Sequence, residues 1–129
     1  MEVARRRVIR VEGMEHKNPI PAAVRIGSMV YSSAIMGTDP QNGLIPDSLE
    51  AEVSNVFHHV SEMMREAGGS IDNIAHFRVY VSDNAVKEAL NREWLLMFPD
   101  EDDRPARHTS VGRLKEGVRI QIEITAVIE

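Results

Sequence analysis

Residues 118–128 read VRIQIEITAVI, and every second side chain in this stretch is apolar. Because successive side chains of a strand point to opposite faces of a sheet, this alternation predicts a strand with one face toward a core. The apolar positions are Val118, Ile120, Ile122, Ile124, Ala126 and Ile128, and they alternate with Arg119, Gln121, Glu123, Thr125 and Val127. The stretch therefore predicts a sheet that is covered on one face and open on the other.

A helix that could cover the apolar face is predicted over residues 49–67. Apolar residues recur there at spacings of three and four, which places them in one stripe along a helix. Asp47, followed three residues later by Glu50, resembles a capping box at the helix start. Gly68-Gly69 is typical of a helix end.

A second helix is predicted between a cap at Ser82 or Asp83 and a stop at Pro99. Its apolar positions are Val86, Leu90, Trp94 and Met97. Because two helices can cover only one face of a small sheet, we expect both of them on the same side.

Further strands are predicted on either side of the first helix. Residues 3–11 interleave Arg with Val and Ile, which suits a charged edge strand. Residues 22–26 and 29–35 are separated only by Gly27-Ser28, which predicts a hairpin with a type II′ turn. Residues 74–81 alternate, with Ala75, Phe77, Val79 and Val81 expected toward the core and His76, Arg78 and Tyr80 away from it.

The order of these segments contains two β-α-β crossovers. It predicts an α+β fold, with a mixed sheet of about six strands and two helices packed on one face, in a single domain over residues 1–129. The open face would carry His76, Arg78, Tyr80, Gln121, Glu123 and Thr125, with apolar help from Tyr31 and Ile35. Because this surface mixes charged, polar and apolar groups, we expect it to be a subunit interface of a homo-oligomer.

Composition narrows the classes of function. With 43% apolar and 27% charged residues, the chain is typical of a globular domain. Its net charge of −5 argues against a general nucleic-acid binder, which needs a basic face to neutralise phosphates. The absence of cysteine excludes disulfides and thiolate nucleophiles. We find neither a signal peptide nor an apolar run long enough for a membrane span, so we expect a cytoplasmic protein.

Arg107 is the first candidate for a functional residue. It follows Arg104-Pro105-Ala106, where the fixed φ of proline stiffens the backbone that leads to it. A guanidinium offers a planar fork of donors that matches a carboxylate, which suits a site for a small anionic substrate. The alternative is an ordinary ion pair with the acidic run at residues 100–103.

Several short motifs, taken in order, suggest a family. They are the Gly27-Ser28 hairpin, Tyr31-Ser32-Ser33 ahead of Asp39-Pro40, the Gly-terminated helix, Val79-Tyr80-Val81, Asn91, Pro105-Ala106-Arg107 and Ile120-Gln121-Ile122-Glu123. From about residue 18 to its end, the chain resembles the Rid family, whose members are also described as YjgF-type or endoribonuclease L-PSP-like proteins. The resemblance implies a chorismate-mutase-like fold, a homotrimer with sites between subunits, and hydrolytic deamination of enamines or imines. It implies no metal and no organic cofactor.

The resemblance also assigns roles to individual residues. Arg107 matches the arginine that grips the substrate carboxylate, Ser33 matches a serine of the same pocket, and Asn91 matches a helix residue that faces the cleft. The backbone N–H groups of Ala34 and Thr109 match main-chain contacts to the ligand.

Two positions depart from the family pattern. Ile20 stands where the typical deaminases have a tyrosine, and Gln121 stands where they have a glutamate. An amide can orient a water molecule but cannot take its proton, so we expect Gln121 to position the attacking water. His108 and His16 are candidates for proton transfer, because histidine titrates near neutral pH.

The resulting hypothesis is a hydrolytic deaminase of small carboxylate-bearing enamines or imines, either 2-aminoacrylate-like or aminomuconate-like. It would release ammonia and a keto acid. One alternative is a non-catalytic trimer that binds small carboxylates or partner proteins. Another is a ribonuclease or translation inhibitor, against which the acidic charge balance counts.

Overall fold

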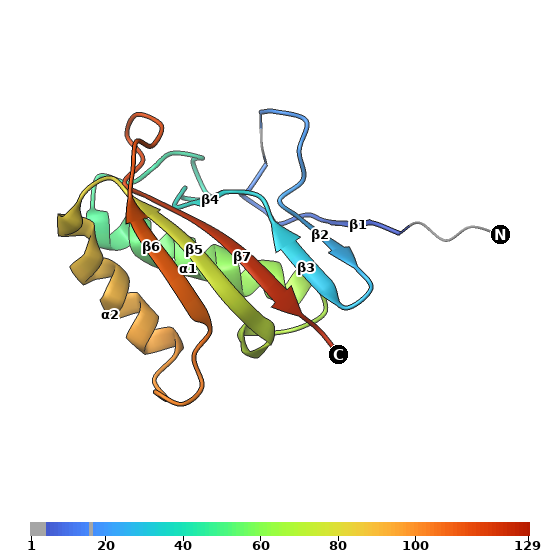
Figure 1. The fold of residues 1–129 in the computed structure, drawn as a ribbon. Coiled ribbons are helices and arrows are strands. Elements are labelled where there is room, and N and C mark those ends of the chain that lie inside the picture. Colours follow the sequence, from blue (N-terminus) through green and yellow to red (C-terminus); the bar gives the residue numbers. More distant parts are fainter. Residues whose placement is uncertain (1–4, 16) are drawn as a thin grey trace.

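The computed structural model describes residues 5–15 and 17–129, and it places one mixed sheet against two helices (Figure 1). The strands are β1 (Arg7–Ile9), β2 (Ala23–Ile26), β3 (Met29–Ser32), β4 (Ile35–Met36), β5 (Ile74–Val81), β6 (Ala106–Val111) and β7 (Ile120–Val127). The helices are α1 (Leu49–Glu66) and α2 (Lys87–Met97), and short 3-10 turns cover Ile71–Asn73 and Asn84–Val86. The predicted α+β fold is confirmed, with a seventh strand added by the two-residue β4.

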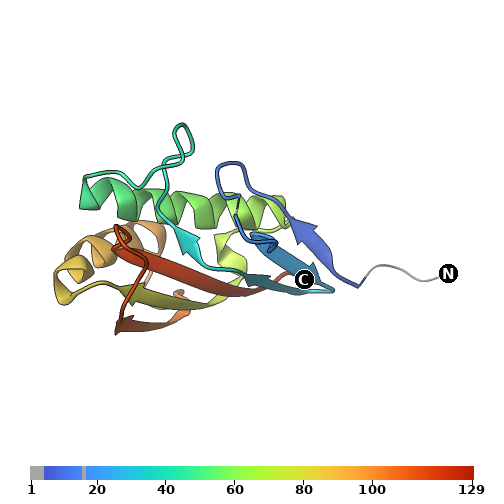
Figure 2. The same ribbon diagram turned by 90° about the horizontal axis from the view of Figure 1, so that it is seen from above.

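The sheet runs in the order β1-β2-β3-β7-β5-β6, and β4 pairs with the part of β7 that β3 leaves free. β7 is antiparallel to β3, β4 and β5, whereas β5 and β6 are parallel. Each helix therefore lies in a connection between parallel strands, as the two predicted crossovers require. Both helices cover the same face of the sheet, which is clear when the molecule is seen from above (Figure 2).

The core lies between this covered face and the helices. The apolar residues of β7 at Ile120, Ile122, Ile124 and Ala126 are buried, as their alternation predicted. They face the buried stripe of α1, which includes Val53, Val56, Phe57, Val60, Met63 and Met64. Burial of these two matched stripes is the main force that holds the helices on the sheet.

The 22–36 hairpin follows the prediction at its turn and departs from it at its end. Gly27 has a φ of +58° and Ser28 does not share a positive φ, as a type II′ turn requires. The strand predicted over 29–35, however, breaks after Ser32, whose Oγ accepts a hydrogen bond from the backbone N–H of Ile124. Residues 32–34 then lie opposite only two residues of β7, 123 and 124. After this bulge each side chain points to the face opposite to the predicted one. The prediction that Ile35 lies on the open face is therefore wrong, because Ile35 is fully buried.

A second bulge, in β5, makes the predicted core position of Ala75 wrong. Ile74 pairs with Ala126 and His76 pairs with Thr125, so Ala75 is an extra residue between them. Ala75 is exposed and Ile74 takes the core position in its place. From His76 onward the predicted alternation is confirmed.

The ends of the predicted elements also shift. Helix α1 is capped by the side chain of Ser48, which accepts from the N–H of Ala51, and not by a capping box of Asp47 and Glu50. A hydroxyl one residue later satisfies the free N–H groups of the first turn equally well. Of the edge strand predicted over 3–11, only Arg7–Ile9 pairs with β2, and residues 3 and 4 lie outside the described part.

Helix α1 is tied to the start of β7 by an ion pair whose carboxylate is buried. The Glu52 carboxylate is fully buried and accepts from the side chain of Arg119 at 2.6 Å and from its backbone N–H at 2.9 Å. The helix passes so close to Gly37 that a Cβ there would overlap the carbonyl oxygen of Glu52 and lie 2.7 Å from its Cγ. Within the described residues, neither helix is long and apolar enough to cross a bilayer.

Candidate functional site

Arg107 lies on β6, an edge strand of the sheet, and points toward α2. It pairs with Phe77 of β5, whose ring is buried on the helix side, and paired residues share a face. Its Nη2 donates to Oδ1 of Asn91 at 2.8 Å, and its Cζ lies 4.8 Å from the ring centroid of Trp94. Both partners belong to α2, so the guanidinium sits in the seam between strand and helix.

The alternative role of Arg107, as the partner of the acidic run at 100–103, is contradicted by this placement. Among the described residues its guanidinium makes no ion pair with that run. Arg104 holds the loop instead, donating from Nε to the carbonyl of Phe98 at 2.8 Å and from Nη2 to that of Pro99 at 3.3 Å.

In the seam, two buried polar atoms have no hydrogen-bond partner among residues 5–15 and 17–129. They are Nη1 of Arg107 and Oγ1 of Thr109, two residues further along β6 and on the same face. Burial lowers the pKa of the Arg107 guanidinium below its usual value, because the charged form loses hydration there. A cation in such a position is stabilised by an anion that supplies the missing contacts, and a small carboxylate fits this chemistry.

His108 lies between Arg107 and Thr109 in sequence but on the other face of β6. It is exposed and pairs with Arg78 on the open face of the sheet. Within one protomer it therefore points away from the guanidinium. His16, the other candidate for proton transfer, lies outside the described residues.

The remaining predicted site residues lie toward the edge of the sheet opposite β6: Ile20 precedes β2, and Ser33 and Ala34 follow β3. Ser33 is joined to the segment before β2, since its Oγ donates to the carbonyl of Pro21 at 2.7 Å and its N–H to that of Ala22 at 2.9 Å. Ile20 is half exposed and lines a cavity of about 610 Å³ under the 12–22 loop. Ala34 lines a smaller hollow of about 180 Å³ together with Met36 and Thr38.

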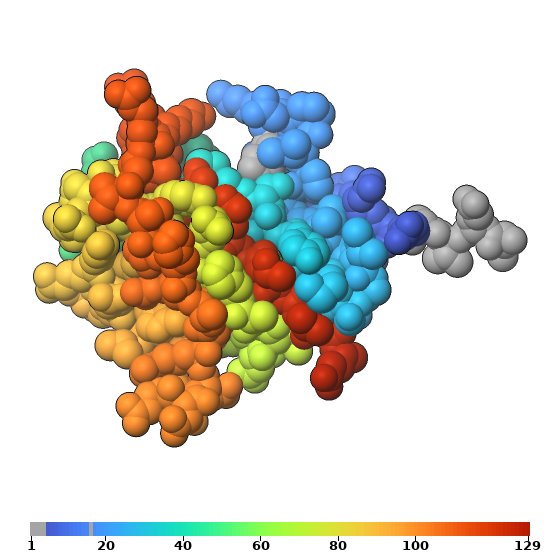
Figure 3. Space-filling model, in the orientation of Figure 1, coloured from blue at the N-terminus to red at the C-terminus, as the bar shows by residue number. Residues whose placement is uncertain are grey.

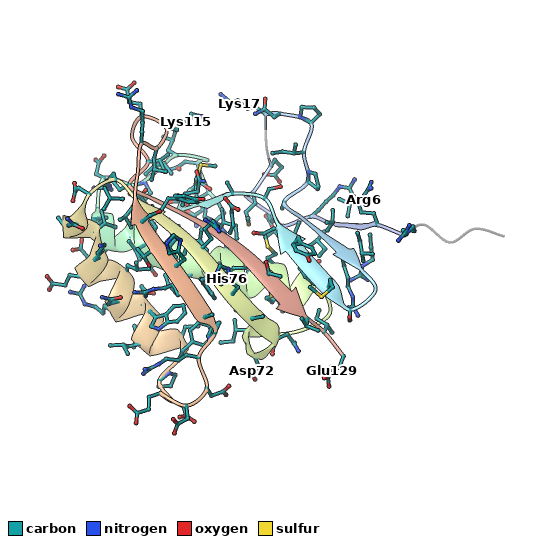
Figure 4. The ribbon with its side chains drawn as sticks, viewed as in Figure 1. Arg6, Lys17, Asp72, His76, Lys115 and Glu129 are labelled. Carbon is teal, nitrogen blue, oxygen red and sulfur yellow. The ribbon has the colours of Figure 1, made fainter. Side chains whose placement is uncertain are left out.

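Gln121 lies on the open face, where it pairs with Tyr80 on one side and Met36 on the other. This face is free of helices, and Figure 3 shows the side chains of β6, β5, β7 and β3 uncovered across it. In Figure 4, His76 marks the middle of the same face, and the loops that carry Lys17 and Lys115 project together at one end. Gln121 and Arg107 thus occupy opposite faces of one sheet.

The candidate residues therefore fall into separate groups within a protomer. Arg107, Asn91 and Thr109 form one group, and Ile20, Ser33 and Ala34 form another. Strands β3 and β6 are three strand spacings apart in the sheet order, which corresponds to roughly 14 Å. A small carboxylate held by Arg107 cannot also reach Ser33 of the same protomer.

Sequence reasoning treated Trp94 only as an apolar position of the second helix. The structure places its ring under the Arg107 guanidinium. The available signal was the spacing of Asn91 and Trp94, which are three residues apart and so share a helix face. No three His, Asp or Glu side chains in the described ranges gather closely enough to hold a metal ion.

Comparison with known proteins agrees with this fold. The family model described as Endoribonuclease L-PSP matches residues 14–128. The chain belongs to this family, the Rid family. A RutC family protein of Aquifex aeolicus is 29% identical to this Rid-family chain over 117 residues, covering 86% of the chain and 94% of that protein. The 2-iminobutanoate/2-iminopropanoate deaminase of Salmonella typhimurium is 29% identical and covers 84% of the chain and 87% of its own length.

Solved structures of Rid proteins share the fold. Escherichia coli TdcF with bound serine superposes with a TM-score of 0.87 at 25% identity, covering 95% of this chain and 99% of its own. RidA of an Antarctic Psychrobacter superposes with a TM-score of 0.85 at 25% identity, over 95% of this chain and 99% of its own.

Proposed function

We propose that this Rid-family protein hydrolyses small carboxylate-bearing enamines and imines, and that it releases ammonia and a keto acid. The observation that carries the proposal is the half-buried guanidinium of Arg107, which makes no ion pair with the acidic loop and whose Nη1 has no partner in the described part of the chain. A relative at 29% identity is named as a 2-iminobutanoate/2-iminopropanoate deaminase, and both imines in that name are carboxylates.

The reaction is a sequence of proton and water transfers. A 2-aminoacrylate enamine takes a proton at its terminal carbon and loses one from nitrogen, which gives the imine. Water adds to the imine carbon, a proton moves to nitrogen, and the carbinolamine expels ammonia as the C–N bond breaks. The product is pyruvate, and no oxidant or reductant is needed.

In this proposal Arg107 binds the carboxylate, and Asn91 and the backbone N–H of Thr109 border the same pocket. Ser33, the backbone N–H of Ala34 and the side chain of Ile20 line the rest of it. Gln121 orients the attacking water, and His108 relays protons. Because free imines hydrolyse readily in water, orientation and neutralisation of the carboxylate supply a useful acceleration without a strong base.

We further propose that the protein is a cytoplasmic homotrimer, with each site between two subunits. Two observations support an assembly. Arg107 and Gln121 lie on opposite faces of the sheet, and β3 is roughly 14 Å from β6. The open face also exposes Tyr31 to 49%, beside charged and polar groups that suit an interface. A neighbouring subunit would then bring the Ile20–Ser33 group, Gln121 and His108 to Arg107.

A second candidate function is carboxylate binding without turnover. It is favoured by Ile20 and Gln121, which offer neither the phenol nor the carboxylate of typical deaminases. Such a protein would still bind a carboxylate through Arg107 and would lose only the chemistry.

Ammonia release from enzymatically generated 2-aminoacrylate separates the two functions. We expect a rate above the spontaneous background, and we expect Arg107→Met to reduce it to that background. Arg92→Met is the matched control, because Arg92 is an exposed arginine of α2 whose removal changes the net charge equally. Saturable pyruvate binding without ammonia release would favour the binding function. RNA cleavage that survives Arg107→Met would contradict both.

A further inference from the structure

Trp94 is the only tryptophan of the chain, and its ring is held in one orientation. It is 9% exposed and meets the rings of Phe77 and Phe98 at centroid distances of 5.1 and 4.9 Å. The interplanar angles of 86° and 60° make both of these edge contacts, a geometry that aromatic pairs prefer over a face-to-face sandwich. Phe57 stacks on Phe77 and both rings are buried, so the cluster is anchored in the core.

The guanidinium of Arg107 occupies the outer side of this cluster. Its Cζ is 4.8 Å from the centroid of the Trp94 ring, within the range of a cation–π contact. The hydrogen bond from Nη2 to Asn91 holds one end of the guanidinium, and the indole lies under its central carbon. The two contacts come from one helix and act on different atoms, so together they restrict the direction of the fork.

We propose that Trp94 is a positioning residue, and that its electron-rich face holds the Arg107 guanidinium in the orientation that receives a substrate carboxylate. The inference rests on the proposed function, because it assumes that Arg107 binds an acid. It adds a residue that never touches the substrate.

Positioning matters here because an arginine side chain has many rotamers. Ordering it on ligand binding costs conformational entropy, and a guanidinium that is already held avoids that cost. Indole is the strongest aromatic partner for a cation, and the contact strengthens where water is excluded, as it is around the buried Nη1. The substrate acid therefore meets a cation that is fixed before it arrives.

Replacement of Trp94 by fluorinated tryptophan tests the electrostatic part of this role directly. Fluorine withdraws electron density from the ring face and changes its shape little. Because the chain has one tryptophan, biosynthetic incorporation labels this site alone. We expect pyruvate affinity, measured by calorimetry, to fall stepwise from ordinary to singly to doubly fluorinated tryptophan, reaching about a threefold to tenfold loss. The melting temperature should stay nearly constant along the series.

A packing control comes from the same cluster. Phe57→Leu loosens the aromatic cluster at a ring that stacks on Phe77 and is not paired with Trp94, so it should lower the melting temperature and leave pyruvate affinity unchanged. Trp94→Phe keeps a weaker aromatic face and should retain more affinity than Trp94→Leu.

The outcomes separate the inference from the function on which it rests. If pyruvate binding is lost in Arg107→Met but does not change on fluorination of Trp94, the positioning role is overturned and the proposed function stands. Tighter binding on fluorination would overturn it too, since the indole would then be a competitor of the acid. A protein with ordinary tryptophan that binds no pyruvate contradicts the proposed function, and the role of Trp94 falls with it.

Discussion

Arg107 donates from Nη2 to Oδ1 of Asn91 at 2.8 Å, and this hydrogen bond joins the edge strand β6 to helix α2. The acceptor is a neutral amide, so the contact orients the guanidinium without neutralising it. An acid that binds there still meets a full positive charge.

Changing that amide to a carboxylate should block the site. In Asn91→Asp the new charge pairs with Arg107 and competes with any incoming acid, so we expect pyruvate affinity to fall by about tenfold or more. Stability in urea should be unchanged or higher. Asn42→Asp is the control, because it adds the same charge in an exposed loop where Oδ1 still accepts from the N–H of Leu44. Equal affinity in both variants would show that Arg107 does not bind the acid.

Thr109→Val should stabilise the free protein. The hydroxyl of Thr109 is buried and has no partner among the residues that the structure describes, and a methyl group of the same shape carries no such cost. We expect a gain of up to about 1 kcal/mol in the free energy of unfolding, measured by urea denaturation. Pyruvate affinity should be preserved, since the proposed contact uses the backbone N–H. Thr109→Ser keeps the hydroxyl and should show no gain. A large loss of affinity in the valine variant would mean that the hydroxyl itself binds the ligand.

Gln121→Glu should raise the rate of deamination. A carboxylate can take the proton of the attacking water, which the amide cannot, and general base catalysis contributes about a hundredfold or more where it operates. We expect kcat for imine hydrolysis to rise by at least about tenfold, with little change in KM. Gln41→Glu, in an exposed loop, controls for the added charge. A variant no faster than the parent would remove Gln121 from the water-binding role.

Gly37→Ala should destabilise the fold. An added Cβ would overlap the carbonyl oxygen of Glu52, which belongs to a helix that cannot move without breaking the buried ion pair to Arg119. We expect a loss of about 3 kcal/mol in the free energy of unfolding. Gly112→Ala is the matched control, because a Cβ at that position has no neighbour within 4 Å. Similar stabilities for the two variants would contradict the close approach of helix and loop.

The fold was largely predictable because its signals are local. The alternation in residues 118–128, the helical stripe from Leu49, the Gly27-Ser28 turn and the stop at Pro99 each act over a few neighbouring residues. The twofold alternation in β7 and the three-and-four spacing of apolar residues in α1 also indicated which faces of these elements are buried. The cap of α1 was misassigned to Asp47 because Ser48 next to it has the same chemistry.

The bulges were not predictable, because they arise in pairing between distant strands. Ile35 is turned inward after Ser32 bonds to Ile124, a residue 92 positions away. Ala75 is displaced by the register between β5 and β7. The alternation of apolar residues describes a single strand. A bulge depends on both strands of a pair, because it occurs where one strand has an extra residue opposite its partner.

By itself, the sequence determined the type and order of the elements, the covered face of the sheet, and the choice of Arg107 as a candidate cation. Only the tertiary structure decided what surrounds that cation. It brought Asn91 and Trp94 of α2 against β6, left Nη1 and the Thr109 hydroxyl without partners, and put Gln121 and His108 on the opposite face. The reason is physical: periodicity specifies which side of an element is apolar, whereas contacts across a seam depend on how two separately formed elements pack together.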